Sequence, residues 1–329
     1  MTIKLLVADL HLTANPQDDY RWKIFEEIEK NIFKYRVEEL IILGDLTDKK
    51  DNHNSFLING ICDHLLKTLY FLKKIIILKG NHDYIDSANP YFKFLSNIIN
   101  IKFVCTPEII GNCLYIPHTH NPTKEYFKQC SIQNIDYIFL HQPFLGAKIH
   151  QKYELKECID AKEIFKDYKQ GRIFSGDIHI PQTLGNIEYV GAPYPIHFGD
   201  EYKSRFILLQ DNKDFISIPV KTINRYFFKL TNIYELQNLT VKENDQVCVR
   251  LEIGREDYSK IDTLKTQIRE FFISKKVEVF SVEITKEKEE KALKQKEDKQ
   301  ENKDWLSDFC KTEKLNISYK EYAEEISQC

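Results

Sequence analysis

Five short apolar runs within the first 180 residues of the chain each end at a motif rich in aspartate, histidine or asparagine. Near-continuous apolar runs are typical of strands that are buried on both faces. Helical patterns separate several of them, for example over residues 22–35 and 56–72. The sequence therefore predicts an α/β fold in which helices flank β-sheets. The five motifs are, in chain order, Asp9-Leu10-His11, Gly44-Asp45, Gly80-Asn81-His82-Asp83, His141 and Gly176-Asp177-Ile178-His179.

The residue types in these motifs favour a metal site. In α/β folds, ligands bind beyond the carboxyl ends of the strands, where every motif falls. A mixture of carboxylate, imidazole and amide groups suits manganese, iron or zinc better than calcium, which prefers oxygen ligands alone. Two cations about 3.5–4 Å apart can share one carboxylate, activate water and bind phosphoryl oxygens. Each motif alone could be a turn or a cap, but five in order favour a two-metal site that cleaves phosphoesters.

The motif order D-x-H, G-D-x-x-D, G-N-H-D, H and G-x-x-H resembles that of the calcineurin-like metallophosphoesterase superfamily over residues 1 to about 200. The protein-phosphatase branch is disfavoured, because it has G-D-x-V-D-R-G and G-N-H-E where this chain has G-D-L-T-D-K-K and G-N-H-D. The chain is instead similar to DNA-repair nucleases of the SbcD type, including phage versions. The matching features are residues 8–12, Asp48, residues 176–182 and residues 189–194.

This resemblance implies a role for each motif residue. Two divalent metal ions, with manganese as the expected identity, would share the Asp45 carboxylate. His82 would be the catalytic imidazole beside the phosphate, and Asp48 would orient it. The remaining ligands would be Asp9, His11 and His179 for one metal, and Asn81, His141 and Asp177 for the other.

Asp177 stands where many relatives have the first histidine of a Gly-His-x-His motif. Aspartate binds manganese and adds negative charge, so we expect a competent site with altered metal binding. The alternative is a weakened second metal in a chain that only binds its target. His118, His120 and His197 are candidates for substrate contacts at the rim of the site, although loop histidines are more often simply solvated.

Four segments are expected along the chain. Residues 1–220 would form the metallophosphoesterase domain and residues 221–285 a small α/β capping domain, which the resemblance implies helps to position DNA. Residues 286–304 contain seven lysines and seven acidic residues and predict a charged linker. Apolar residues return in segment 305–329, which predicts a docking tail around Trp305, Leu306 and Phe309. The resemblance implies an SbcC-like coiled-coil ATPase as its partner; the alternative is a helix that folds back on the capping domain.

Composition limits the remaining possibilities. The formal charge of −3 gives no general basic footprint, but metal ions can themselves attract nucleic acid. Eight cysteines without a C-x-x-C pair predict reduced thiols, and no apolar stretch reaches about 18 residues. We therefore expect a cytoplasmic protein, in the host cytoplasm if viral, that forms a homodimer and does not enter membranes.

The function expected from the sequence is a manganese-dependent DNA nuclease, acting as exonuclease or endonuclease. It would be the catalytic subunit of an SbcCD-like recombination and repair complex. Two alternatives stay open at this point: a stand-alone phosphodiesterase or phosphatase for small molecules, and a non-catalytic DNA-binding scaffold subunit.

Overall fold

The structure is a computed structural model that describes residues 2–129, 134–150, 153–166, 168, 171–210 and 214–286. The predicted docking segment with Trp305, Leu306 and Phe309 lies outside the described residues, as does the predicted linker from residue 287 onward.

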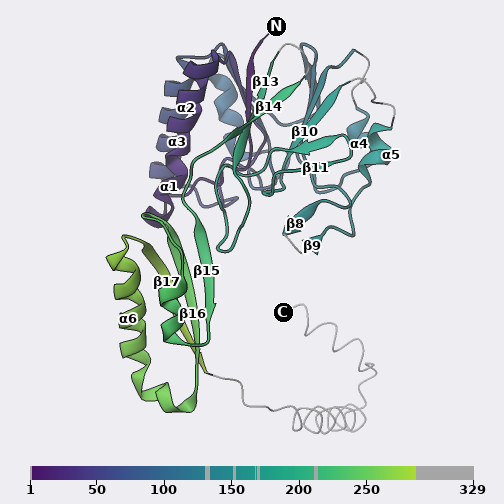
Figure 1. Ribbon diagram of the computed structural model, residues 1–329. Helices are drawn as coiled ribbons and strands as arrows, with labels where there is room; N and C mark the ends of the chain where they lie inside the picture. Colours follow the sequence, from purple (N-terminus) through teal and green to yellow (C-terminus); the bar gives the residue numbers. More distant parts are fainter. Residues whose placement is uncertain are drawn as a thin grey trace, which may run out of the picture.

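Two six-stranded sheets form the centre of the protein (Figure 1). The first has the order β14-β13-β1-β2-β3-β4 and the second the order β11-β12-β10-β7-β6-β5. The strands of the first sheet are β1 (Lys4–Val7), β2 (Glu39–Ile42), β3 (Lys74–Leu78), β4 (Ile101–Val104), β13 (Arg205–Leu209) and β14 (Phe215–Pro219). Those of the second are β5 (Glu108–Ile110), β6 (Cys113–Ile116), β7 (Tyr137–His141), β10 (Arg172–Gly176), β11 (Gln182–Leu184) and β12 (Ile187–Tyr189).

Apolar side chains of alternate residues from both sheets form one buried cluster, which includes Leu6, Ile41, Ile76, Phe139 and Phe174. The two sheets therefore pack face to face. Within them, β1, β2 and β3 run parallel to one another, and β7 runs parallel to β10. Each of these five strands precedes or ends at one of the motifs. The parallel arrangement brings the carboxyl ends of neighbouring strands to one edge of each sheet.

Helices cover the outer faces of both sheets. On the first sheet, α2 (Ile24–Tyr35) buries Phe25, Ile28 and Ile32 in the core that it shares with α3 (Ser55–Leu69). The Asn54 side chain caps α3 by accepting the N–H of Leu57 at 2.9 Å. The other elements are α1 (Asp19–Trp22), α4 (Lys124–Phe127), α5 (Ala161–Phe165), the ribbon of β8 (Lys148–His150) and β9 (Tyr153–Glu154), and the 3₁₀ turns Pro16–Asp18 and Tyr91–Asn97. The order helix, sheet, sheet, helix confirms the predicted α/β fold.

A smaller α/β unit follows the two sheets in sequence and lies below them in Figure 1. Its parallel sheet has the order β15-β16-β17, and α6 connects the last two strands. Leu264, Ile268 and Phe272 of α6 pack on this sheet in a core of their own. The elements are β15 (Arg225–Leu230), β16 (Gln246–Ile253), α6 (Ile261–Ser274), β17 (Glu278–Lys286) and the 3₁₀ turns Ile233–Asn238 and Arg255–Lys260. The domain boundary at residue 220 stays a prediction.

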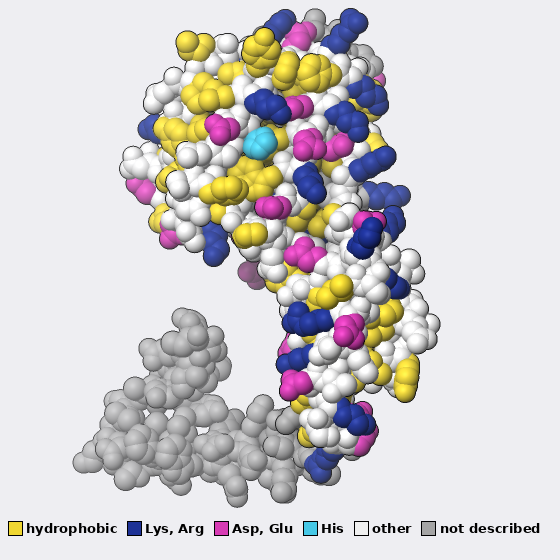
Figure 2. Space-filling view, turned by 90° about the vertical axis from the view of Figure 1, so that its left-hand side faces the viewer, with side chains coloured by type: hydrophobic (Ala, Val, Ile, Leu, Met, Phe, Trp, Pro, Cys, Tyr) yellow, Lys and Arg dark blue, Asp and Glu magenta, His cyan; other side chains and the backbone are white. Residues whose placement is uncertain are grey.

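Figure 2 views the protein from the side that carries α2, α3 and α6, as labelled in Figure 1. Lys and Arg side chains gather along the right-hand edge of the upper part of this view, and acidic side chains are scattered among apolar ones nearer its middle. Among the described residues, no helix has both the length and the apolar character needed to cross a membrane.

Candidate metal centre

The loops that follow the five strands meet at one place. The backbone N–H of His11 donates to the carbonyl of Asp45 at 2.9 Å, and the N–H of His82 donates to the Asp45 carboxylate at 2.9 Å. The N–H of Asp177 donates to the Asp9 carboxylate at 3.0 Å. These contacts join the loops after β1, β2 and β3 of the first sheet to the loop after β10 of the second. The candidate ligands of both sheets therefore belong to one site.

Several candidate ligands have an unusual backbone conformation. Asp9, His11, Asp45 and Asp177 have φ angles of 54°, 40°, 54° and 74°. Residues other than glycine seldom adopt this left-handed region, and such positions cluster at functional sites. These left-handed residues lie shortly after the ends of β1, β2 and β10.

Gly80 is required by the close approach of two loops. A Cβ atom at this position would lie 2.1 Å from Oδ1 of Asp45 and 2.4 Å from its backbone nitrogen. No such contact is tolerated without moving the backbone of the Asp45 loop. The glycine therefore allows the loop after β3 to pack directly against the central candidate ligand.

Three groups of side chains could each hold a metal ion. Within each group, the potential ligand atoms all lie within 4.8 Å of one another. The Asp45 carboxylate belongs to two groups, as the predicted bridging role requires, although the role itself stays a prediction. Asp9 also belongs to two, and His82 belongs to one. The groups, found among the described residues, are Asp9, His11 and His179; Asp9, Asp45 and His141; and His11, Asp45 and His82.

His141 is oriented toward this cluster by its backbone surroundings. Its Nδ1–H donates to the carbonyl of Leu43, which leaves Nε2 facing the site. Nε2 lies 3.1 Å from the Asn81 amide oxygen, 3.5 Å from Asp45 Oδ1 and 3.6 Å from Asp177 Oδ1. Asn81 and Asp177 thus join the site at His141, where we expected the second metal.

Several lone pairs in the site lack a donor. The Asn81 amide oxygen faces only acceptors, the nearest at 2.9 Å on Asp45. Turning the amide would direct its NH₂ group at the same atoms. Asp9 Oδ2 is buried and has no hydrogen-bond partner among the described residues. Oxygen and nitrogen lone pairs that converge in this way fit a divalent metal such as manganese, iron or zinc.

Burial controls the protonation of the site. It raises the pKa of Asp177 to about 6 and raises the pKa of Asp9 well above its usual range. Burial alone would raise the pKa of Asp45 too, but the His141 imidazole holds it below the usual value. Burial lowers the pKa of His179 to about 4, so this imidazole is neutral at pH 7. Neutral imidazole is the form that binds metals.

His82 is held differently from what we expected. Its Nδ1–H donates to the backbone carbonyl of Asp48, whereas the Asp48 carboxylate lies 3.3 Å from a guanidinium nitrogen of Arg21 and 3.6 Å from Nδ1 of His11. The turn after β2 directs the carbonyl, and not the side chain, at His82. Asp48 therefore orients this imidazole through its backbone.

The three rim candidates occupy different surroundings. His118 is buried, and its Nδ1 lies 2.9 Å from the hydroxyl of Tyr84. Burial lowers its pKa to about 3. The ring of exposed His120 lies 5.1 Å from that of His118, and the ring of exposed His197 lies 5.8 Å from that of His179. His118 is thus an interior residue whose ring lies 6.0 Å from that of His141, and His197 lies at the surface beside His179.

Asp83 is a residue of the site whose role the sequence did not reveal. Its carboxylate accepts three backbone N–H groups, from Gly80 at 2.7 Å and from Asp45 and Leu46 at 3.0 Å. Burial raises its pKa to about 7. The carboxylate thus ties the loop after β3 to the loop after β2. The only sequence signal was its place at the end of the Gly80 motif, which also fits an ordinary turn.

We expect Asp83→Ala to lower the free energy of unfolding by about 3–5 kcal/mol, because it leaves three buried N–H groups without an acceptor. Urea unfolding monitored by circular dichroism would measure the change. The exposed Asp63 on α3 provides the matched control, since Asp63→Ala should change stability by less than about 0.5 kcal/mol. Equal effects of the two substitutions would contradict the anchoring role of Asp83.

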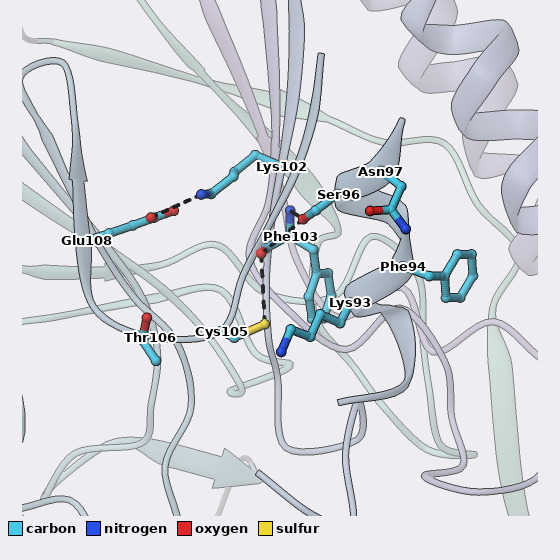
Figure 3. Close-up of a pocket in the computed structure, with 9 residues that line it drawn as sticks. All are labelled: Lys93, Phe94, Ser96, Asn97, Lys102, Phe103, Cys105, Thr106 and Glu108. Carbon is cyan, nitrogen blue, oxygen red and sulfur yellow. Dashed lines mark hydrogen bonds and ion pairs between the residues drawn. The ribbon is translucent and has the colours of Figure 1, made fainter. Parts of the chain in front are cut away.

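A pocket of about 550 Å³ lies elsewhere, along the edge strands β4 and β5 (Figure 3). Lys102 and Glu108 form an ion pair of 3.1 Å at this pocket. Lys93, Phe94, Ser96, Asn97, Phe103, Cys105 and Thr106 complete its lining. None of the candidate ligands lines it, so it is separate from the metal centre.

One comparison with known proteins, the scan against family models, agrees with the fold. The family model described as calcineurin-like phosphoesterase matches residues 4–181. A search of curated protein sequences gives no match. Among solved structures, the chain is similar to the one titled "Crystal structure of Pseudomonas putida nuclease MPE", with 15% sequence identity, a TM-score of 0.34, and coverage of 65% of this chain and 87% of that chain.

Proposed function

The chain belongs to the calcineurin-like phosphoesterase family, and on this premise we propose that it is a manganese-dependent DNA nuclease of the SbcD type. Family membership makes it a metal-dependent phosphoester hydrolase. The observation that supports the proposal most directly is the convergence of Asp45 with His11, His82 and His141 at one buried site. The specific substrate and metal are our proposals.

The ligand set indicates how the site would hold two divalent ions. Asp9, His11 and His179 form one compact group, and His141 faces Asn81 and Asp177, with Asp45 between the two. When bound, the ions would supply an activated water and neutralise charge on phosphoryl oxygens. The carboxylates and neutral imidazoles of the chain would fix the number and the direction of the ligand atoms.

His82 would assist the departure of the leaving oxygen. The Asp48 carbonyl accepts its Nδ1–H, so the ring is fixed and Nε2 is the nitrogen that can hold the transferable proton. The form of the ring that can donate from Nε2 is the doubly protonated one. His82 would thus act as a general acid toward a substrate phosphodiester.

The smaller α/β unit favours a polymeric substrate over a small one. The N–H of Gly199 donates to the carbonyl of Arg225 at 2.8 Å and so links the loop of His197 to β15. The same loop returns to the metal centre, where the N–H of Ala192 donates to the carbonyl of His179 at 2.9 Å. A strand of DNA that extends from the site toward this loop would meet the smaller unit, which a small phosphoester would not need.

The wider context of the nuclease is also a proposal. Residues 305–329 would dock on an SbcC-like coiled-coil ATPase, and the complex would act in recombination and repair in the cytoplasm. A homodimer would place two nuclease sites in one complex.

Cleavage of end-labelled double- and single-stranded DNA with Mn²⁺ tests the proposal. We expect the parent protein to release labelled products, and chelation by EDTA to stop the reaction. A chromogenic phosphodiester, bis(p-nitrophenyl) phosphate, would be assayed alongside. Hydrolysis of this ester without DNA cleavage would favour a small-molecule phosphodiesterase. Failure on both substrates, even with a partner ATPase, would favour a binding scaffold.

A further inference from the structure

Three charged residues connect the metal centre to the smaller α/β unit. Arg21 lies on α1, Asp18 ends the 3₁₀ turn before it, and Arg225 is the first residue of β15. All three are buried, with exposed fractions of 4%, 7% and 5%. We refer to Arg21, Asp18 and Arg225 as the arginine relay. None of them belongs to a motif that the sequence singled out.

Arg21 contacts two loops of the metal centre. One terminal guanidinium nitrogen donates to the backbone carbonyl of His11, and the same nitrogen lies 3.3 Å from the Asp48 carboxylate. The carbonyl of Asp48 in turn accepts the Nδ1–H of His82. Arg21 therefore contacts the candidate ligand His11 directly and reaches the candidate general acid His82 through Asp48.

The rest of the guanidinium is fixed from the other side. Its Nε–H donates to the Tyr20 hydroxyl at 3.2 Å, and its second terminal nitrogen lies 3.5 Å from Oδ1 of Asp18. The other carboxylate oxygen of Asp18 accepts the Thr13 hydroxyl at 2.9 Å. All three nitrogens of Arg21 thus have partners, an arrangement that the point charge of a lysine cannot reproduce.

Arg225 extends this network to the smaller unit. It lies 3.9 Å from the same Asp18 oxygen and donates to the carbonyl of Ile196, in the loop that follows the last candidate ligand. Its guanidinium lies over the ring of Phe198, 4.0 Å from the centroid, and Phe198 packs on Phe280 of β17 at 4.9 Å. A continuous chain of contacts therefore runs from β15 and β17 through Asp18 to Arg21.

We propose that Arg21 is a positioning residue of the metal centre, and that Asp18 and Arg225 make its position depend on the smaller α/β unit. The relay touches neither the candidate ligand atoms nor a substrate. It holds the backbone carbonyl of His11 and the carboxylate of Asp48. These two residues lie in the loops that set where the His11 and His82 imidazoles point. This inference rests on the proposed function only in taking phosphodiester hydrolysis as one of its two measurements.

The physical reason for such a residue is the strained turn that it supports. His11 has a φ of 40°, a conformation that persists only when its surroundings fix it. The buried guanidinium of Arg21, which donates to the His11 carbonyl, supplies that constraint. Loss of the constraint would let the His11 loop relax, and small displacements of a ligand or acid weaken catalysis without preventing folding.

The test compares Arg21→Lys with the parent protein in two measurements. We expect kcat on bis(p-nitrophenyl) phosphate to fall by about 10- to 100-fold with KM within about threefold, as substitutions behind metal ligands do. Calorimetric titration with Mn²⁺ alone should show an affinity lowered by about tenfold. Parental kcat together with parental Mn²⁺ affinity would overturn the proposal.

Arg225→Lys tests the connection to the smaller unit. We expect a fall in kcat of about 3- to 30-fold, the range for residues that couple distant parts of a protein. Because Arg225 reaches the metal centre only through Asp18 and Arg21, the double variant should be no slower than Arg21→Lys alone. Fully additive losses would exclude the coupling. If Arg21→Lys fails to fold, Arg225→Lys alone decides, and its parental kcat and Mn²⁺ affinity would overturn the proposal.

Arg205→Lys is the matched control. This arginine is also largely buried and donates to the carbonyls of Val190 and Tyr189 and to Glu188. None of these partners is a candidate ligand, so thermal stability should fall while kcat and Mn²⁺ affinity stay at the parental values. An equal loss of kcat would show that any buried arginine has this effect and would overturn the proposal. If the parent hydrolyses no phosphodiester, the proposed function fails, and Mn²⁺ affinity alone then tests the relay.

Discussion

Asp45→Asn should lower kcat for phosphodiester hydrolysis by about 10³-fold or more. The carboxylate lies at the centre of the site, within 3.5 Å of both His11 and His141 nitrogens. Asparagine keeps the size of the side chain but removes the charge that would hold two cations together. We expect the Mn²⁺ stoichiometry, measured by calorimetry or by elemental analysis after gel filtration, to fall from two ions per chain to one or none.

The exposed Asp86 offers a control for this substitution. Its carboxylate accepts the backbone N–H of Ala88 and the Asn89 amide and contacts none of the candidate ligands. Asp86→Asn should therefore leave kcat and Mn²⁺ stoichiometry unchanged. Two bound ions and more than a tenth of the parental kcat in Asp45→Asn would exclude the bridging role.

His82→Ala should lower kcat by about 10²- to 10⁴-fold, which is the usual contribution of a positioned general acid. Mn²⁺ stoichiometry should not change, since this imidazole is expected to act on the leaving oxygen. Rates of DNA cleavage at saturating Mn²⁺, with metal content determined on the same samples, separate the two effects. Loss of an ion in His82→Ala would instead make His82 a ligand, which its group with His11 and Asp45 also permits.

Asp48→Ala tests which part of Asp48 orients the His82 imidazole, the backbone carbonyl or the carboxylate. It keeps the backbone carbonyl that accepts the Nδ1–H of His82 and removes only the carboxylate beside Arg21. We expect a loss of less than about tenfold in kcat. A loss as large as that of His82→Ala would mean that the carboxylate, and not the carbonyl, controls the imidazole.

The sequence was sufficient for the fold class because the apolar runs of β1, β2, β3, β7 and β10 are local signals. Each run is short, apolar and bounded by polar residues, so its own sequence predicts a buried strand, whatever strands pair with it in the sheet. Parallel strands then place their carboxyl ends at one edge, which explains why the order of motifs along the chain could predict one site.

The sequence could not predict how the loops of this site hold one another. The anchoring by Asp83, the carbonyl contact of Asp48 and the burial of His118 all depend on contacts between segments far apart in the chain. Residue type does not tell whether a side chain or a backbone carbonyl will face a neighbour. That choice follows from the turn conformation after each strand.

Chemical composition of the site was thus determined by the sequence alone: carboxylates, imidazoles and an amide at the ends of buried strands. Only the tertiary structure decided the geometry that could make it work, including the left-handed turns at Asp9 and Asp45 and the contact of Arg21 with His11 and Asp48. The reason is physical. Strand formation depends on short-range hydrophobic patterns, whereas strained turns and buried charges are stable only when distant parts of the chain enclose them.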